Sequence, residues 1–168
     1  LTEEEQPSLG RRFGTPSVYP VARILGATEP TMTVLTDGPD SPNAADEWHT
    51  DVTWMATPPK AALLHMDTPA EVGGDTLWAS ATAAYDTLSA PMQEFLCGLR
   101  VVHHNAGFAA RVAEKAGDAA DAIVEALERD YPPVVHPMVR THPETGKRAI
   151  LYARRFISHI ENLTPCLL

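Results

Sequence analysis

Two residues near the middle of the chain have the types and spacing to bind a metal ion. His49 and Asp51 stand two positions apart within residues 48–54 (WHTDVTW), a β-branched and aromatic stretch that predicts a strand. Side chains at positions i and i+2 of a strand point to the same face, and their Cα atoms lie roughly 6–7 Å apart. One imidazole and one carboxylate are two of the three ligands in a 2-His-1-carboxylate facial triad, a site typical of iron(II). The pair is therefore a candidate metal site.

The spacing alone leaves other interpretations open. A His-x-Asp pair is short, and Asp51 could simply hydrogen-bond to His49 on the polar face of a strand. A zinc hydrolase could use the same two residues with a further histidine. The sequence shows no HxxxH helix and no cysteine set for such a zinc site, and its two cysteines stand in no metal-ligand spacing.

The elements around this pair are predicted from apolar periodicity and from turn residues. Further strands are expected at residues 31–36, 61–66, 75–78 and 99–103, and a hairpin is expected from residues 134–141 and 148–152 around a turn at 143–146. Helices are expected at residues 2–13, at 80–97 with a restart at 89–91, and at 107–129. Trp48 and Trp78 are interpreted as core aromatics. The strand-rich order with inserted helices predicts a mainly β fold with helices.

Composition limits the class of protein. A length of 168 residues suits a single domain over 1–168, and 44% hydrophobic with 21% charged residues is typical of a globular protein. The net charge of -9 argues against a nucleic-acid partner. No apolar run reaches the length of a membrane span and no signal peptide opens the chain, so no membrane partner and a cytoplasmic location are expected.

Several longer strings carry a family resemblance. They are WHTDVTW followed by Pro-Pro, GGDTLWAS at residues 73–80, LGRRFGTPSVY at 9–19, and VVHPMVRTHPETGKRAIL at 134–151. Together, and in this order, they resemble the taurine dioxygenase (TauD/TfdA) family of iron(II)- and 2-oxoglutarate-dependent oxygenases. The resemblance covers nearly the whole chain. It implies a double-stranded β-helix core, a jelly roll of the cupin type, that is incomplete in this chain.

The resemblance also implies roles for single residues. His49 and Asp51 match the family's first two iron ligands and are the implied catalytic residues. Thr76 matches a threonine whose hydroxyl binds a carboxylate of 2-oxoglutarate, and a hydroxyl can donate to such an oxygen. The implied cofactors are Fe(II), with 2-oxoglutarate and O2 as cosubstrates. The implied reaction hydroxylates a small organic acid, such as a taurine-like sulfonate or an alkyl sulfate, and releases succinate and CO2.

Three further residues match positions that line the family's substrate pocket, namely Tyr19, Val52 and Phe156. In taurine-specific members a histidine precedes the pocket tyrosine by three residues, and here that position is Pro16. A different sulfonate, an alkyl sulfate ester or another small acid therefore fits the sequence as well as taurine does.

The sequence departs from the family in what it contains after the hairpin. The family's third ligand, a histidine, and the arginine that pairs with 2-oxoglutarate both lie beyond that hairpin, further than residue 168. The chain is therefore expected to be an internal portion of the fold. The alternative is a catalytically inactive fragment or interaction module that retains the fold. His136 and His142, within the hairpin string, are interpreted as structural. A homo-oligomer is expected, because an incomplete sandwich exposes strand edges and apolar surface.

Overall fold

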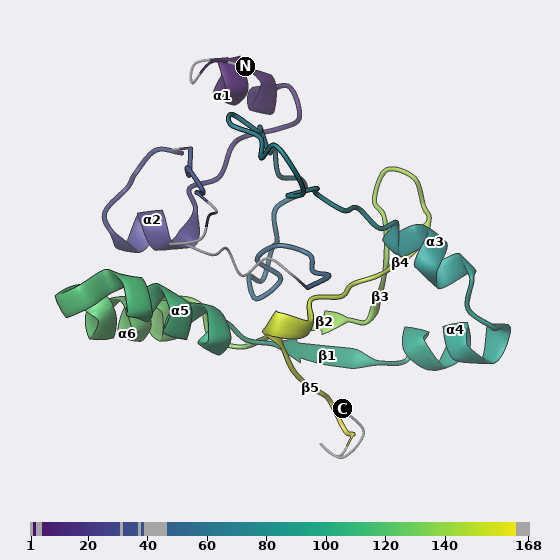
Figure 1. The fold of residues 1–168 in the computed structure, drawn as a ribbon. Coiled ribbons are helices and arrows are strands. Elements are labelled where there is room, and N and C mark those ends of the chain that lie inside the picture. Colours follow the sequence, from purple (N-terminus) through teal and green to yellow (C-terminus); the bar gives the residue numbers. More distant parts are fainter. Residues whose placement is uncertain (1, 3–4, 31, 37, 39–46, 164–168) are drawn as a thin grey trace. The chain divides into compact units, whose positions relative to one another are not determined.

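The computed structural model describes residues 2, 5–30, 32–36, 38 and 47–163. The chain forms two compact units (Figure 1). Unit 1 contains residues 1–46 and 59–76, and unit 2 contains residues 47–58 and 77–168. The candidate metal ligands belong to unit 2. The single domain over residues 1–168 stays a prediction.

Unit 1 contains two short helices joined by irregular chain. Helix α1 (Glu5–Arg11) begins with a reciprocal cap: the Thr2 hydroxyl accepts from the Glu5 amide at 3.2 Å, and a Glu5 carboxylate oxygen accepts from the Thr2 amide at 2.9 Å. The predicted helix at 2–13 is thus confirmed over its centre. Helix α2 (Pro20–Ile24) begins at Pro20, whose fixed φ suits the first helical turn.

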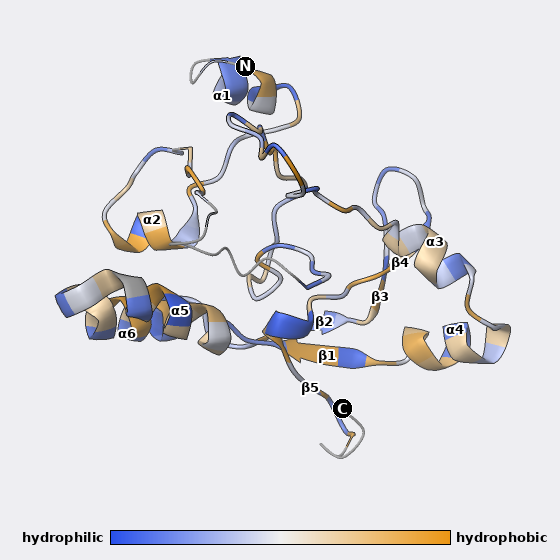
Figure 2. Ribbon diagram, in the orientation of Figure 1, coloured by the Kyte–Doolittle hydropathy of each residue, from blue (hydrophilic) through white to orange (hydrophobic). Residues whose placement is uncertain are grey.

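Unit 2 is built on a three-stranded antiparallel sheet with β1 in the middle. Strand β1 (Arg100–His103) confirms the strand predicted at 99–103, and it pairs with β2 (Val134–Pro137) on one side and β5 (Ile157–Ile160) on the other. Figure 2 shows β1 as hydrophobic over most of its length. Val101 and His103 are both fully buried, so one face of this central strand forms core.

A second, two-stranded sheet confirms the predicted hairpin in part: residues 139–141 join it, whereas residues 134–137 of the strand expected at 134–141 pair with β1 instead. Strands β3 (Val139–Thr141) and β4 (Arg148–Ile150) pair antiparallel, with Arg140 opposite Ala149. The His142 ring closes the turn, because its Nδ1 accepts from the amides of Glu144 at 3.2 Å and Thr145 at 3.3 Å. These contacts agree with a structural role for His142.

The helices of unit 2 follow their predicted places with one difference. Helices α3 (Ala81–Asp86) and α4 (Ala90–Cys97) show the expected restart, and Ser80 caps α3 by accepting from the Ala83 amide at 3.1 Å. The single helix expected at 107–129 is instead α5 (Ala106–Ala116), the 3-10 turn η1 (Gly117–Ala119) and α6 (Ala120–Asp130). Gly117 has φ 56° and interrupts the helix, and α5 and α6 lie side by side (Figure 1).

The prediction of a mainly β fold is wrong for the described residues. Helical residues outnumber strand residues there, and both sheets are small. Residues 32–36, 61–66 and 75–78 adopt no regular secondary structure, and residue 31 lies outside the described residues. Apolar alternation marks a segment that fits a strand, but a strand also needs a neighbour to pair its N–H and C=O groups.

Burial corrects three further expectations. Leu64, in the run interpreted as a buried strand, is 60% exposed. The two tryptophans interpreted as core aromatics are exposed as well, Trp48 at 55% and Trp78 at 81%. Hydrophobicity alone does not place a side chain inside, because much of a protein surface is apolar.

Candidate metal site and its supporting core

The His49 and Asp51 side chains face each other. The distance from His49 Nε2 to Asp51 Oδ1 is 3.2 Å, and the side chains are 32% and 63% exposed. The strand expected at residues 48–54 is wrong: residues 48–50 are irregular and residues 51–54 form a turn. The reason is local, since Val52 has φ 48°, a left-handed conformation that ends any strand. The turn brings the two ligand candidates together in place of strand geometry.

A hydrogen bond sets the orientation of the His49 ring. Its Nδ1 lies 2.7 Å from the carbonyl oxygen of Glu47. A carbonyl only accepts, so Nδ1 donates in this contact, and Nε2 is the ring nitrogen that faces Asp51. Metal-binding histidines commonly use this arrangement, with one ring nitrogen donating to a fixed acceptor and the other facing the ion. The two side chains therefore fit a metal ion such as iron(II).

The described residues supply only part of a metal site. Among them, no group of three or more His, Cys, Asp or Glu side chains converges as an ion would require. His136 does not join the pair, because its Nε2 lies 3.0 Å from the carbonyl oxygen of Met55. This contact agrees with the structural role expected for His136.

Residues 47–55, here called the ligand loop, are held to the rest of unit 2 on both sides of Asp51. On one side, the Thr50 amide donates to the Tyr152 carbonyl at 2.9 Å. On the other, the Thr53 hydroxyl lies 2.9 Å from His103 Nδ1, and both residues are fully buried. Sequence reasoning assigned Thr53 and His103 no role in holding this loop. The available signal was a histidine at an inward position of an apolar strand.

His103 sits in a site that disfavours its charged form. Burial is the main cause that lowers its pKa, to about 4, and the neighbouring His136 ring adds to the shift. The two ring centroids are 5.3 Å apart in an edge-to-face arrangement. His103 Nε2 is buried without a hydrogen-bond partner in the described part of the chain. Near neutral pH the ring is therefore neutral, and its Nδ1 is hydrogen-bonded to the Thr53 hydroxyl.

Trp54 fastens the end of the turn into the hydrophobic core. Its side chain is 1% exposed, stacks on Phe108 with centroids 5.6 Å apart, and meets the edge of Tyr131 at 5.1 Å. Phe108 belongs to α5 and Tyr131 follows α6, so the ligand loop is packed against both helices. Trp54 thus anchors the turn that carries Asp51 in the hydrophobic core of unit 2.

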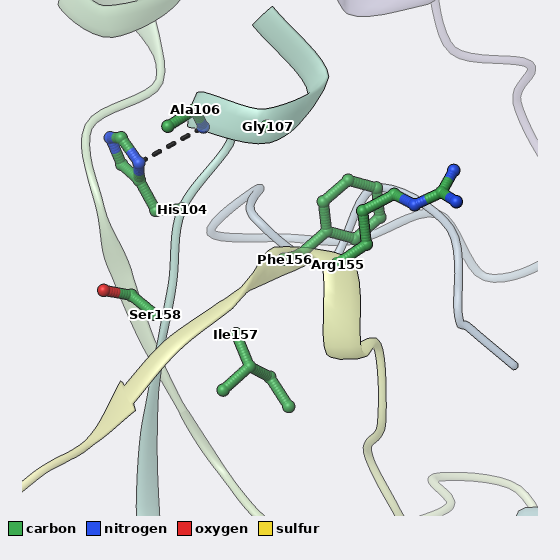
Figure 3. Close-up of a pocket in the computed structure, with 7 residues that line it drawn as sticks. All are labelled: His104, Ala106, Gly107, Arg155, Phe156, Ile157 and Ser158. Carbon is green, nitrogen blue, oxygen red and sulfur yellow. Dashed lines mark hydrogen bonds between the residues drawn. The ribbon is translucent and has the colours of Figure 1, made fainter. Parts of the chain in front are cut away.

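Two of the predicted substrate residues lie in unit 2. Phe156 is 8% exposed and contributes to a pocket of about 180 Å³ between the start of α5 and the start of β5 (Figure 3). In Figure 3 His104 lies on one side of this pocket and Phe156 and Arg155 lie on the other, and the Ala106 amide donates to His104 Nδ1 at 3.2 Å. Val52 lies in the ligand loop and is half-buried. The roles of Val52 and Phe156 in substrate binding stay predictions.

The other two predicted residues, Tyr19 and Thr76, belong to unit 1. Tyr19 is half-buried just before α2, and Thr76 is exposed in irregular chain. Unit 1 has its own open pocket of about 370 Å³, lined by α1, α2 and the chain between and after them, and it includes Arg11, Arg23 and Glu29. The participation of Tyr19 and Thr76 at the His49–Asp51 site stays a prediction.

Comparison with known proteins identifies the family. Residues 1–165 match the model of the taurine catabolism dioxygenase TauD, TfdA family, and the chain belongs to this family. The family consists of 2-oxoglutarate-dependent dioxygenases that use Fe(II). A taurine dioxygenase structure from Burkholderia xenovorans superimposes with a TM-score of 0.55 at 35% identity, over 71% of this chain and 35% of that chain. The fold of the superimposed part of the chain is therefore TauD-like.

Two curated relatives are similar in sequence. An alpha-ketoglutarate-dependent sulfate ester dioxygenase of Pseudomonas putida is 32% identical over 89% of this chain and 49% of its own length. An alpha-ketoglutarate-dependent sulfonate dioxygenase of Saccharomyces cerevisiae is 32% identical over 95% of this chain and 34% of its own length. The chain thus spans half or less of these relatives.

In the described ranges, no helix is both long and apolar enough to traverse a bilayer.

Proposed function

We propose that the protein containing this chain is an Fe(II)- and 2-oxoglutarate-dependent dioxygenase that hydroxylates a small sulfonate or alkyl sulfate ester. The observation that carries the proposal is the pairing of His49 Nε2 with Asp51 Oδ1 at 3.2 Å, with the ring held by Glu47, in a chain of this family. The names of the two relatives support the substrate class, one a sulfate ester dioxygenase and the other a sulfonate dioxygenase.

In this proposal each of the predicted site residues has a defined task. His49 and Asp51 hold the iron, and the Glu47 carbonyl keeps the His49 lone pair directed at it. Bound iron(II) supplies the oxidising chemistry with O2 and 2-oxoglutarate, which leaves as succinate and CO2. The Thr76 hydroxyl donates to a 2-oxoglutarate carboxylate. Tyr19, Val52 and Phe156 line the substrate side and keep water out. Hydroxylation of the carbon next to the sulfur group gives a product that collapses to an aldehyde and sulfite or sulfate.

Anaerobic titration of the full-length gene product with iron(II) and 2-oxoglutarate tests the metal site. Chelation of 2-oxoglutarate by iron(II) gives a visible charge-transfer band that neither component gives alone. We expect the band in the wild type and its loss in His49→Ala, because one of the two ligands in this chain is removed. His159→Ala is the matched control, since His159 is exposed on β5, where its Nδ1 lies 3.2 Å from the neighbouring Ser158 hydroxyl. A wild type without the band contradicts the proposal.

Substrate class is tested separately by turnover. Linear alkyl sulfates, alkanesulfonates and taurine are offered with iron(II), 2-oxoglutarate and air, and succinate, sulfate and sulfite are measured. Release of sulfate or sulfite in a one-to-one ratio with succinate supports the proposal. Succinate formation that none of these compounds stimulates argues for a different acid.

A further inference from the structure

The ligand loop contains a backbone conformation that needs outside support. Val52, between Asp51 and Thr53, has φ 48°, and a β-branched residue rarely adopts positive φ because its Cβ crowds the backbone. Such a conformation persists where neighbouring contacts determine it. The Met55 amide donates to the Val52 carbonyl at 3.0 Å and closes the turn, but this contact lies within the turn itself.

The outside support comes from the middle of the sheet. Thr53, the residue after Val52, is fully buried, and its hydroxyl lies 2.9 Å from Nδ1 of the fully buried His103. His103 belongs to β1 and is paired on both sides, opposite Val134 and opposite Ile157. The hydrogen bond therefore links the turn to β1, the central strand, which is paired with a neighbouring strand on each side.

The identity of residue 103 is also informative. A fully buried inward position on a central strand ordinarily carries an aliphatic side chain. Here a histidine occupies it, with its Nε2 buried and without a partner in the described part of the chain. Burial of an imidazole is unfavourable unless its polar atoms are satisfied. The contact with Thr53 is what the histidine provides that a leucine could not.

We propose that Thr53 and His103 form a buried positioning pair for the metal site. The pair holds Val52 in its left-handed conformation and thereby keeps the Asp51 carboxylate beside the His49 ring. This inference rests on the proposed function, because it takes His49 and Asp51 as metal ligands. Neither Thr53 nor His103 touches the metal in this scheme, and both act through the loop.

The test compares Thr53→Val, which keeps the shape and removes the hydroxyl, with Thr53→Ser, which keeps the hydroxyl. In the full-length protein, we expect Thr53→Val to weaken iron(II) binding roughly 10–100-fold, the usual effect of losing a group that orients a ligand. Thr53→Ser stays near wild type. His103→Asn, which places a polar atom near the Nδ1 position, retains more iron affinity than His103→Leu.

A second measurement needs no metal. Hydrogen exchange is followed by mass spectrometry in the metal-free protein, and Thr53→Val is expected to speed exchange in residues 50–55 roughly tenfold, without change in α6. Equal iron affinity and equal exchange in Thr53→Val and Thr53→Ser would overturn the inference. If the wild type binds no iron, the oxygenase proposal fails, and the exchange comparison still decides whether the pair anchors the loop. Thr53→Ala replaces Thr53→Val if the latter does not fold.

Discussion

At the scale of single residues, the chemistry of the site depends on which ring nitrogens of its histidines already form hydrogen bonds. The Glu47 carbonyl accepts a hydrogen bond from Nδ1 of His49, and Nε2 is the ring nitrogen that faces Asp51. The Thr53 hydroxyl is hydrogen-bonded to Nδ1 of His103, whose Nε2 is buried in the core. Two histidines of one unit thus have different tasks, because one is half-exposed beside a carboxylate and the other is buried.

The buried ring of His103 predicts a pH dependence of stability. Its pKa is about 4 in the folded protein and 6.5 when exposed, so between these values the unfolded state binds more protons. The free energy of unfolding therefore falls as the pH drops from 6.5 toward about 4, and the contribution is constant below that. Denaturant titrations across this range check the prediction.

Other groups titrate in the same range, so the comparison needs a variant. His103→Asn cannot take up this proton and retains a polar atom toward Thr53, so its unfolding free energy should fall less steeply with acid than that of the wild type. Parallel pH profiles of the two proteins would show that His103 does not titrate as expected.

At the scale of elements, the sequence was most informative where the signal is local. The β3–β4 hairpin was predicted with its turn, because turn residues between two apolar runs favour a local pairing, but the pairing of residues 134–137 with β1 was missed. The strand at 99–103 and the restart at 89–91 were equally local. The strand predicted at residues 61–66 was wrong, because an apolar run does not show which neighbouring strand would pair with it. The turn at Asp51 was missed since nothing in WHTDVTW marks Val52 for a positive φ.

The break between α5 and α6 gives a prediction at this scale. Gly117 has φ 56° and ψ -131°, a region that side-chain-bearing residues avoid, and a Cβ there would meet open space. Gly117→Ala should therefore lower the free energy of unfolding by about 1–2 kcal/mol through backbone strain alone. Chemical denaturation measures the change.

Gly10→Ala is the matched control for this prediction. Gly10 lies within α1, its added Cβ also meets open space, and its φ is not in the positive range. Because alanine favours a helix over glycine, Gly10→Ala should stabilise rather than destabilise. Destabilisation of the same size at both positions would point to a cause other than the conformation of Gly117.

At the scale of the whole molecule, the family could be predicted from the sequence but the complete site could not. Several long motifs in the order typical of the family predicted the membership, and the match over residues 1–165 confirms it. The chain spans 49% of the sulfate ester dioxygenase and 34% of the sulfonate dioxygenase, and the described residues bring together two candidate ligands, His49 and Asp51. Local patterns place the two candidate ligands on the chain, whereas the convergence of a third side chain depends on contacts that no single segment encodes.

The exposed apolar side chains of unit 2 give a prediction for residues 1–168 produced alone. Leu77 is 71% exposed, Trp78 81% and Phe95 54%, and large apolar side chains left in water favour association. We expect this polypeptide to self-associate, with a sedimentation coefficient that rises with concentration. Trp78→Lys should weaken the association without changing His49 or Asp51, and Ser158→Lys, at an exposed site on β5, is the control for added charge. A sharp, reversible melt of a monomer at all concentrations would show that these side chains are covered within one chain.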